Sequence, residues 1–154
     1  MDAYDEVVMD HIKNARNYRV LDAPDLQAEG INPLCGDEMT VYLRIDSGRI
    51  ADVAFQCTCC GISMASASIV TQMIKGRDVE AADAILREFI ATIEGTNRPA
   101  PGDSSEQAAI RATLKRFPGR KRCASLAPAT LALALSDRGS RSCAPLGAGR
   151  SPAG

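Results

Sequence analysis

Histidine is almost absent from this sequence, since His11 is the only one among 154 residues. Any metal site must therefore be built from thiolates and carboxylates, a ligand set that suits zinc or an iron–sulfur cluster. We expect His11 itself to be a packed or helix-surface residue rather than a ligand, because nothing near it in the sequence would share an ion with it.

An excess of one charge is also missing. The chain has 18 lysines and arginines against 19 aspartates and glutamates, so its formal charge is -1. No global field therefore draws it to nucleic acid or to anionic lipid. No apolar run approaches membrane-spanning length, and residues 1–6 are acidic where a secretory signal would be basic. We expect a cytoplasmic protein that uses no nucleic acid or membrane and whose partners are proteins or ions.

Cysteine, in contrast, is well represented, with six residues. Glutathione and thioredoxin keep cytoplasmic thiols reduced, so we expect no stable disulfide. The abundance of cysteine then favours metal or sulfur chemistry.

Hydrophobic periodicity predicts a mixture of helices and one hairpin. Apolar and polar residues alternate over 39–45 and again over 51–57, with turn residues at 46–48 between them. The expected helices span residues 4–12, 62–75, 79–93, 104–116 and 127–135. The last is expected to begin near Ala127, because Pro128 is tolerated only in a first turn. We therefore predict one domain over residues 1–135 and a disordered tail over 136–154, which has almost nothing to bury.

Three cysteines stand in loops or at helix starts. Cys35 and Asp37 flank a glycine, so a tight loop can aim a thiol and a carboxylate at one ion. Cys60 precedes a predicted helix, whose exposed amides and dipole favour a thiolate. Cys123 follows the basic residues 120–122, whose charge has the same effect.

Each of these residues also has a simpler interpretation when taken alone. A free cysteine often behaves as a small buried hydrophobe, and an aspartate beside glycine commonly stabilises its own turn. Cys57 continues the apolar face of its strand and is interpreted as core filling rather than as a ligand. The role of Cys59 stays undecided, and Cys143 in the tail is interpreted as incidental.

Five segments carry a more specific combined pattern: 8–17 (VMDHIKNARN), 32–37 (NPLCGD), 55–60 (FQCTCC), 62–68 (ISMASAS) and 117–123 (FPGRKRC). Together they resemble the U-type iron–sulfur assembly scaffolds, the IscU and NifU amino-terminal family, over most of residues 4–135. The SufU branch is the most similar. The long stretch between Cys60 and Cys123 is typical of it, and Arg122 stands where the IscU branch carries a histidine.

The resemblance implies an α+β fold of the SufE/NifU-like kind, with helices packed on a small three-stranded antiparallel sheet. Its first strand would be short and lie just before Asn32. The metal ligands would be Cys35, Asp37, Cys60 and Cys123, holding zinc or alternatively a [2Fe-2S] cluster.

The implied partners are a SufS-like cysteine desulfurase and other iron–sulfur assembly proteins. The desulfurase would deliver sulfur as persulfide, and we expect Cys35 to accept it, because this cysteine lies on a loop relieved by Gly36. An acceptor on a loop can move to a partner at less conformational cost than one at a helix start.

Three functions are compatible with these residues. The chain could be a sulfurtransferase-like acceptor rather than a conventional enzyme, a scaffold that assembles a cluster on the same four residues, or a purely structural zinc module. The sequence departs from the family pattern at Cys57 and Cys59, which replace small residues such as glycine. Ala15 replaces a usual proline, and Pro128 falls near a usual aromatic residue.

Overall fold

The structure is a computed structural model that describes residues 3–33, 36–94 and 105–136. Cys35 and Cys143 lie outside the described residues, as does the tail predicted over residues 136–154, except for Ser136, which is the last residue of a helix.

Three antiparallel strands form one sheet in the order β1 (Leu26–Asn32), β2 (Asp37–Asp46) and β3 (Arg49–Thr58). The predicted hairpin is therefore confirmed. Alternate residues of β2, such as Val41 and Leu43, are fully buried, while those between them face outward, as a two-residue period requires. β1 includes Asn32 rather than ending before it, and Asn32 pairs with Asp37 across the ladder.

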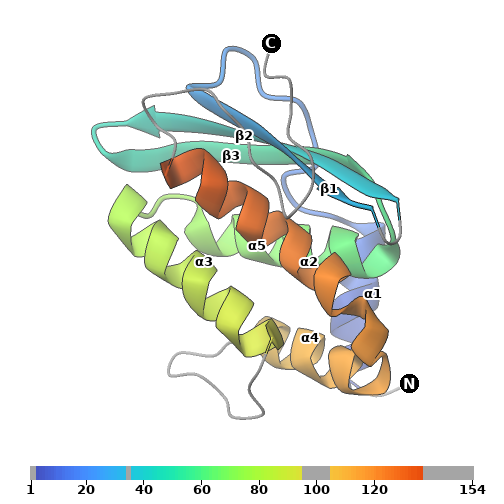
Figure 1. The fold of residues 1–154 in the computed structure, drawn as a ribbon. Helices are drawn as coiled ribbons and strands as arrows, with labels where there is room; N and C mark the ends of the chain where they lie inside the picture. Colours follow the sequence, from blue (N-terminus) through green and yellow to red (C-terminus); the bar gives the residue numbers. More distant parts are fainter. Residues whose placement is uncertain (1–2, 34–35, 95–104, 137–154) are drawn as a thin grey trace.

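The helices gather on one face of the sheet (Figure 1), which confirms the expected α+β class. They are α1 (Ala3–Lys13), α2 (Gly61–Ile74), α3 (Val79–Glu94), α4 (Ser105–Arg116) and α5 (Lys121–Ser136), with a short 3-10 turn, η1 (Pro118–Arg120). Both α2 and α3 pack against α5, and α5 also packs against β1. None of the described helices is long and apolar enough to cross a membrane.

The predicted start of the last helix was wrong. α5 begins at Lys121, six positions before the expected Ala127, and Pro128 lies inside it. Proline has no N–H to donate to the carbonyl four residues earlier, which belongs to Ala124. The buried hydroxyl of Ser66 donates to that carbonyl at 2.5 Å, so a neighbouring helix supplies the missing donor.

Gly30 allows α5 to lie directly on β1. A Cβ atom at this position would lie 2.1 Å from Oγ1 of Thr130, far inside van der Waals contact. The helix can therefore approach the strand closely only where the side chain is missing. This packing holds the start of α5 near one end of the sheet. At that end β1 connects to β2, and β3 connects to α2.

Candidate metal centre

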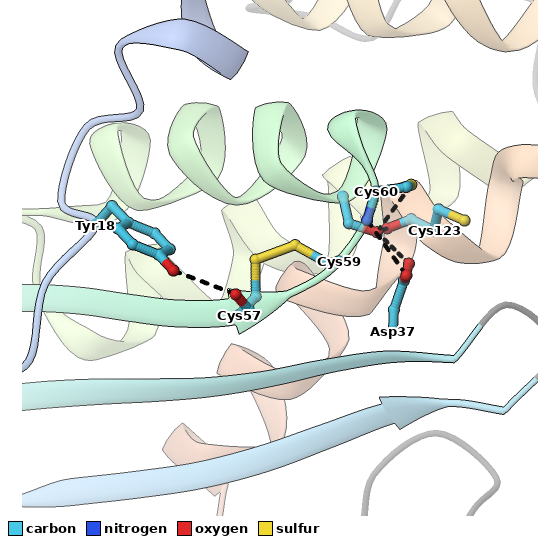
Figure 2. The surroundings of a disulfide bond; sticks show 7 residues. Tyr18, Asp37, Cys57, Cys59, Cys60 and Cys123 are labelled. Carbon is cyan, nitrogen blue, oxygen red and sulfur yellow. Dashed lines mark hydrogen bonds between the residues drawn. A yellow bond between two sulfur atoms is a disulfide. The ribbon is translucent and has the colours of Figure 1, made fainter.

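Asp37, Cys60 and Cys123 come together from three separate segments. Asp37 is the first residue of β2, Cys60 is the N-cap of α2, and Cys123 lies in the first turn of α5. One carboxylate oxygen and the two sulfur atoms all lie within 4.8 Å of one another. Figure 2 shows the three side chains on the same side of the α2 start. Three of the four predicted ligands are thus brought together, while the fourth, Cys35, lies outside the described residues.

Asp37 is placed by the turn between β1 and β2. Gly36 has φ +74°, a conformation that glycine adopts without a Cβ clash, and its N–H donates to the carbonyl of Asn32 at 2.8 Å. The backbone N–H of Cys60 donates to Oδ1 of Asp37 at 3.3 Å. An amide at a helix start has no partner within the helix, so this one is available to orient the carboxylate. Asp37 is 3% exposed to solvent.

Ser63 joins the three candidate ligands, although no sequence pattern predicted this role. Its buried Oγ lies 2.7 Å from Oδ2 of Asp37, 3.0 Å from the carbonyl oxygen of Cys123 and 3.6 Å from Sγ of Cys60. Its position in the sequence could have indicated this role, because Ser63 lies one helical turn after Cys60 in a predicted helix. Ser63 is therefore an orienting residue for the centre.

Cys123 lies beside two hydrogen-bond donors. The residue is 2% exposed, and Nδ2 of Asn32 and Nη1 of Arg120 each lie 4.0 Å from its sulfur. An amide donor and a guanidinium both stabilise negative charge on sulfur. The basic run beside Cys123 thus reaches the centre through Arg120, while Lys121 and Arg122 are exposed.

The donor set fits zinc. Sulfur ligands at about 2.3 Å from a tetrahedral ion lie about 3.8 Å apart, so donors already within 4.8 Å need only small side-chain adjustments. Two thiolates and a carboxylate supply the soft and charged ligands that zinc accepts. Ser63 and the Cys60 amide add the hydrogen bonds to the carboxylate that commonly surround a metal ligand.

Cys57 and Cys59 depart from the sequence prediction. They form a disulfide with a Cα–Cα separation of 5.5 Å, although no stable disulfide was expected. Cys57 pairs with Met39 near the end of β3 and packs partly against the core, as predicted, while Cys59 lies just beyond the strand. The chain turns there toward α2, and this turn brings the two residues within disulfide range. Neither residue belongs to the group of candidate ligands.

His11 is buried within the helical layer, which confirms that it packs inside the protein. Its Nδ1 lies 2.7 Å from Oγ of Ser68, and its Nε2 lies 3.2 Å from Oε2 of Glu106. Burial lowers the pKa of His11, and this effect exceeds the opposing one of the Glu106 carboxylate. The contacts join α1, α2 and α4.

The chain is similar to proteins of one known family. Residues 3–124 match the NifU-like N-terminal domain. The zinc-dependent sulfurtransferase SufU of Bacillus subtilis is 37% identical over 123 residues, which are 80% of this chain and 82% of that protein. The iron–sulfur cluster assembly scaffold protein IscU of Thermotoga maritima is 31% identical over 137 residues, covering 86% and 92%.

Solved structures show the same fold. A putative iron–sulfur cluster assembly scaffold protein for the SUF system, from Fervidobacterium islandicum AW-1, superposes with a TM-score of 0.76 at 28% identity. The superposition covers 84% of this chain and 94% of the other. With a family match that spans most of the described residues, and relatives that match most of their own length, this chain belongs to the NifU-like N-terminal domain family.

Proposed function

We propose that this protein takes part in iron–sulfur cluster assembly by accepting persulfide sulfur from a cysteine desulfurase at a zinc site of Cys35, Asp37, Cys60 and Cys123. The convergence of Asp37, Cys60 and Cys123 within 4.8 Å carries the proposal. A similar protein, SufU of Bacillus subtilis, is named a zinc-dependent sulfurtransferase, which supports the choice of metal and reaction.

The described residues have separate tasks in this proposal. Cys60 and Cys123 would hold the ion from two helix starts, whose backbone positions are set by packing. Asp37 supplies the hard ligand and is kept in place by Ser63 and by the Cys60 amide. When bound, zinc holds the ligand sulfurs as thiolates at neutral pH.

Cys35 is assigned as the persulfide acceptor. It precedes Gly36, whose φ of +74° marks a turn, whereas Cys60 and Cys123 belong to helix starts. A residue on such a connection can leave the metal and reach a partner at less conformational cost than one at a helix end. The thiolate of Cys35 would attack the outer sulfur of the desulfurase persulfide. The S–S bond of that persulfide would break, the desulfurase cysteine would leave as a thiolate, and Cys35 would carry the persulfide.

The partners follow from this chemistry. The sulfur donor is a SufS-like cysteine desulfurase, and the receivers are other iron–sulfur assembly proteins. The exposed basic residues Arg120, Lys121 and Arg122 beside the centre would attract an acidic surface on the donor. We place the reaction in the cytoplasm, where such thiols are kept reduced.

A second function uses the same ligands. A scaffold would assemble a [2Fe-2S] cluster on the same four residues before passing it on, and a thiolate-rich ligand set is compatible with this. The IscU relatives are named scaffolds. The described part of the chain offers no histidine to this centre, since His11 bonds Ser68 and Glu106, so both functions would rely on the same thiolates and carboxylate.

One experiment tests the proposal. The protein is purified without oxygen, assayed for zinc, iron and labile sulfide, and then incubated with a desulfurase and cysteine. Peptide mass spectrometry then locates the added sulfur. We expect zinc and a persulfide on Cys35, which Cys35→Ser abolishes and the matched control Cys143→Ser retains.

Other outcomes separate the alternatives. Stoichiometric iron and sulfide with little zinc would favour the scaffold. Zinc without any sulfur transfer, and without stimulation of the desulfurase, would leave a structural zinc module. Persulfide on Cys123 with Cys35 unmodified would reduce Cys35 to a ligand.

A further inference from the structure

Cys57, Thr58 and Cys59 form a feature that the proposed sulfur acceptance does not use. A disulfide joins the two cysteines across one intervening residue, and Cys59 is followed directly by Cys60 of the metal centre. Figure 2 shows the disulfide on one side of Cys60 and the other candidate ligands, Asp37 and Cys123, on the opposite side. The chain therefore carries a second sulfur pair immediately beside its metal centre.

We propose that Cys57 and Cys59 are a two-electron thiol–disulfide couple that reduces persulfide sulfur at the adjoining metal centre and releases it as hydrogen sulfide. The inference rests on the proposed function in one respect, namely that persulfide sulfur reaches this centre. It assigns the two electrons for this reduction to Cys57 and Cys59, whereas Cys35 only accepts the sulfur.

The local geometry allows both states of the couple. The Cα atoms lie 5.5 Å apart, within the ordinary disulfide range, so the bond can form without large backbone movement. Each residue is partly buried rather than enclosed. Cys57 and Thr58 also help to line an open groove of about 440 Å³ at this end of the sheet, so solvent and small thiols can approach.

The backbone around the pair is held from both sides. The hydroxyl of Tyr18 donates to the carbonyl of Cys57 at 3.2 Å, and the N–H of Cys60 donates to Asp37. These contacts anchor the backbone at Cys57, the first residue of the segment, and at Cys60, which directly follows it. Opening the disulfide would therefore release the side chains of Cys57 and Cys59 while their distance from the centre is kept.

The reaction balances in two exchange steps. The Cys59 thiolate attacks the outer sulfur of a persulfide, R–S–SH; the S–S bond breaks, R–SH leaves, and Cys59 carries the persulfide. The Cys57 thiolate then attacks the sulfur of Cys59 that is bonded to carbon, forms the disulfide and expels hydrogen sulfide. The transferred sulfur gains two electrons, the two thiols lose them, and both thiol protons end on R–SH and hydrogen sulfide. A cellular dithiol reductant restores the starting thiols.

The disulfide of the structure corresponds to the oxidised form of the couple, with which the proposed cycle ends. Iron–sulfur clusters contain sulfide, whereas a persulfide delivers sulfur that is two electrons more oxidised. The couple would thus perform the reduction that must lie between sulfur acceptance and cluster formation.

The test begins with the reduced full-length protein, freed of reductant and mixed without oxygen with glutathione persulfide. We expect about one sulfide per chain, together with a Cys57–Cys59 disulfide in the peptide map, because each chain holds one such pair. The same protein kept in its disulfide form, which needs no mutation, should release none. Cys59→Ser should also release none, and Cys57→Ser should retain persulfide on Cys59, while Cys143→Ser should behave like the unaltered chain.

Equal sulfide release from the oxidised and reduced proteins would overturn the inference, as would release without formation of the Cys57–Cys59 disulfide. A parallel arm replaces glutathione persulfide by a desulfurase and cysteine. If this arm leaves persulfide on the chain but releases no sulfide, the couple is refuted while sulfur acceptance stands. If sulfide appears only with glutathione persulfide, the couple stands and acceptance from the desulfurase fails. Zinc content and circular dichroism of each variant verify that the fold is kept.

Discussion

The hydroxyl of Ser66 donates a 2.5 Å hydrogen bond to the carbonyl of Ala124, four residues before Pro128. This carbonyl would otherwise accept from the N–H that proline lacks. Ser66 on α2 therefore makes a proline tolerable inside α5, the helix that carries Cys123.

Ser66→Ala should destabilise the protein by about 1–3 kcal/mol, because it leaves a buried carbonyl without a donor. Pro128→Ala should reduce that loss, since alanine restores an N–H four residues after Ala124. Urea denaturation of the two single variants and the double variant measures the coupling between them. Strictly additive effects would show that Ser66 does not compensate for the proline.

Ser63→Ala should weaken zinc binding by roughly 10- to 100-fold, because the Asp37 carboxylate and the start of α5 lose a shared orienting group. Ser66→Ala is the matched control, since it also removes a buried α2 serine bonded to an α5 carbonyl, but that carbonyl belongs to Ala124 and not to a candidate ligand. Competition with a chromogenic chelator measures both affinities. An equal loss in the two variants would assign the effect to helix packing alone.

Asp37→Asn should lower zinc affinity while the fold is kept, because an amide retains the shape of the side chain but not its charge. About one zinc per chain is expected in the unaltered protein and less in the variant. Asp46→Asn, at an exposed carboxylate, is the control. Thermal unfolding with and without a chelator adds a second measurement, since a metal that binds only the folded chain raises its melting temperature.

Cys57→Ser should keep the zinc, because Cys57 is not among the candidate ligands. It should also keep persulfide acceptance at Cys35, since only the later reduction step uses the couple. Metal analysis and peptide mass spectrometry test both statements. Loss of zinc from this variant, with circular dichroism unchanged, would make Cys57 part of the metal centre.

The free energy of unfolding should fall as the pH drops below about 6.5, the ordinary pKa of histidine. Burial lowers the pKa of His11 in the folded state, so the unfolded chain binds the proton more readily and acid favours unfolding. Glu106 and Asp10 oppose this shift, while Arg16 adds to it. The stabilising effect of neutral His11 is complete above pH 6.5 and is lost as the pH falls through the folded-state pKa.

Since the chain has one histidine, His11→Gln should flatten the stability profile between about pH 5 and 6.5. Urea denaturation at several pH values provides the measurement. A slope in this range that is unchanged in the variant would assign it to other groups.

Local patterns were sufficient for most of the fold. The alternation along β2 and β3 predicted the hairpin, because a strand with one buried face repeats every two residues. Apolar spacing likewise predicted α2 and α3 to within a residue or so at each end. The sequence pointed to three of the candidate ligands, because each lies beside a glycine or near a predicted helix start: Asp37, Cys60 and Cys123. The structure brings these three residues together.

The tertiary structure determined the contacts between distant residues, which local sequence patterns do not encode. Pro128 indicated a helix start because a single helix cannot replace its missing N–H, and only the packing of α2 on α5 places Ser66 to do so. The contacts of Ser63 with Asp37 and Cys123 likewise depend on the fold, since these residues are far apart in the sequence and meet only in the folded chain. Composition suggested the absence of disulfides, but whether Cys57 and Cys59 can join depends on where β3 ends and turns toward α2. The sequence by itself thus determined which residues can bind metal and sulfur, and the tertiary structure decided which of them lie close enough to act together.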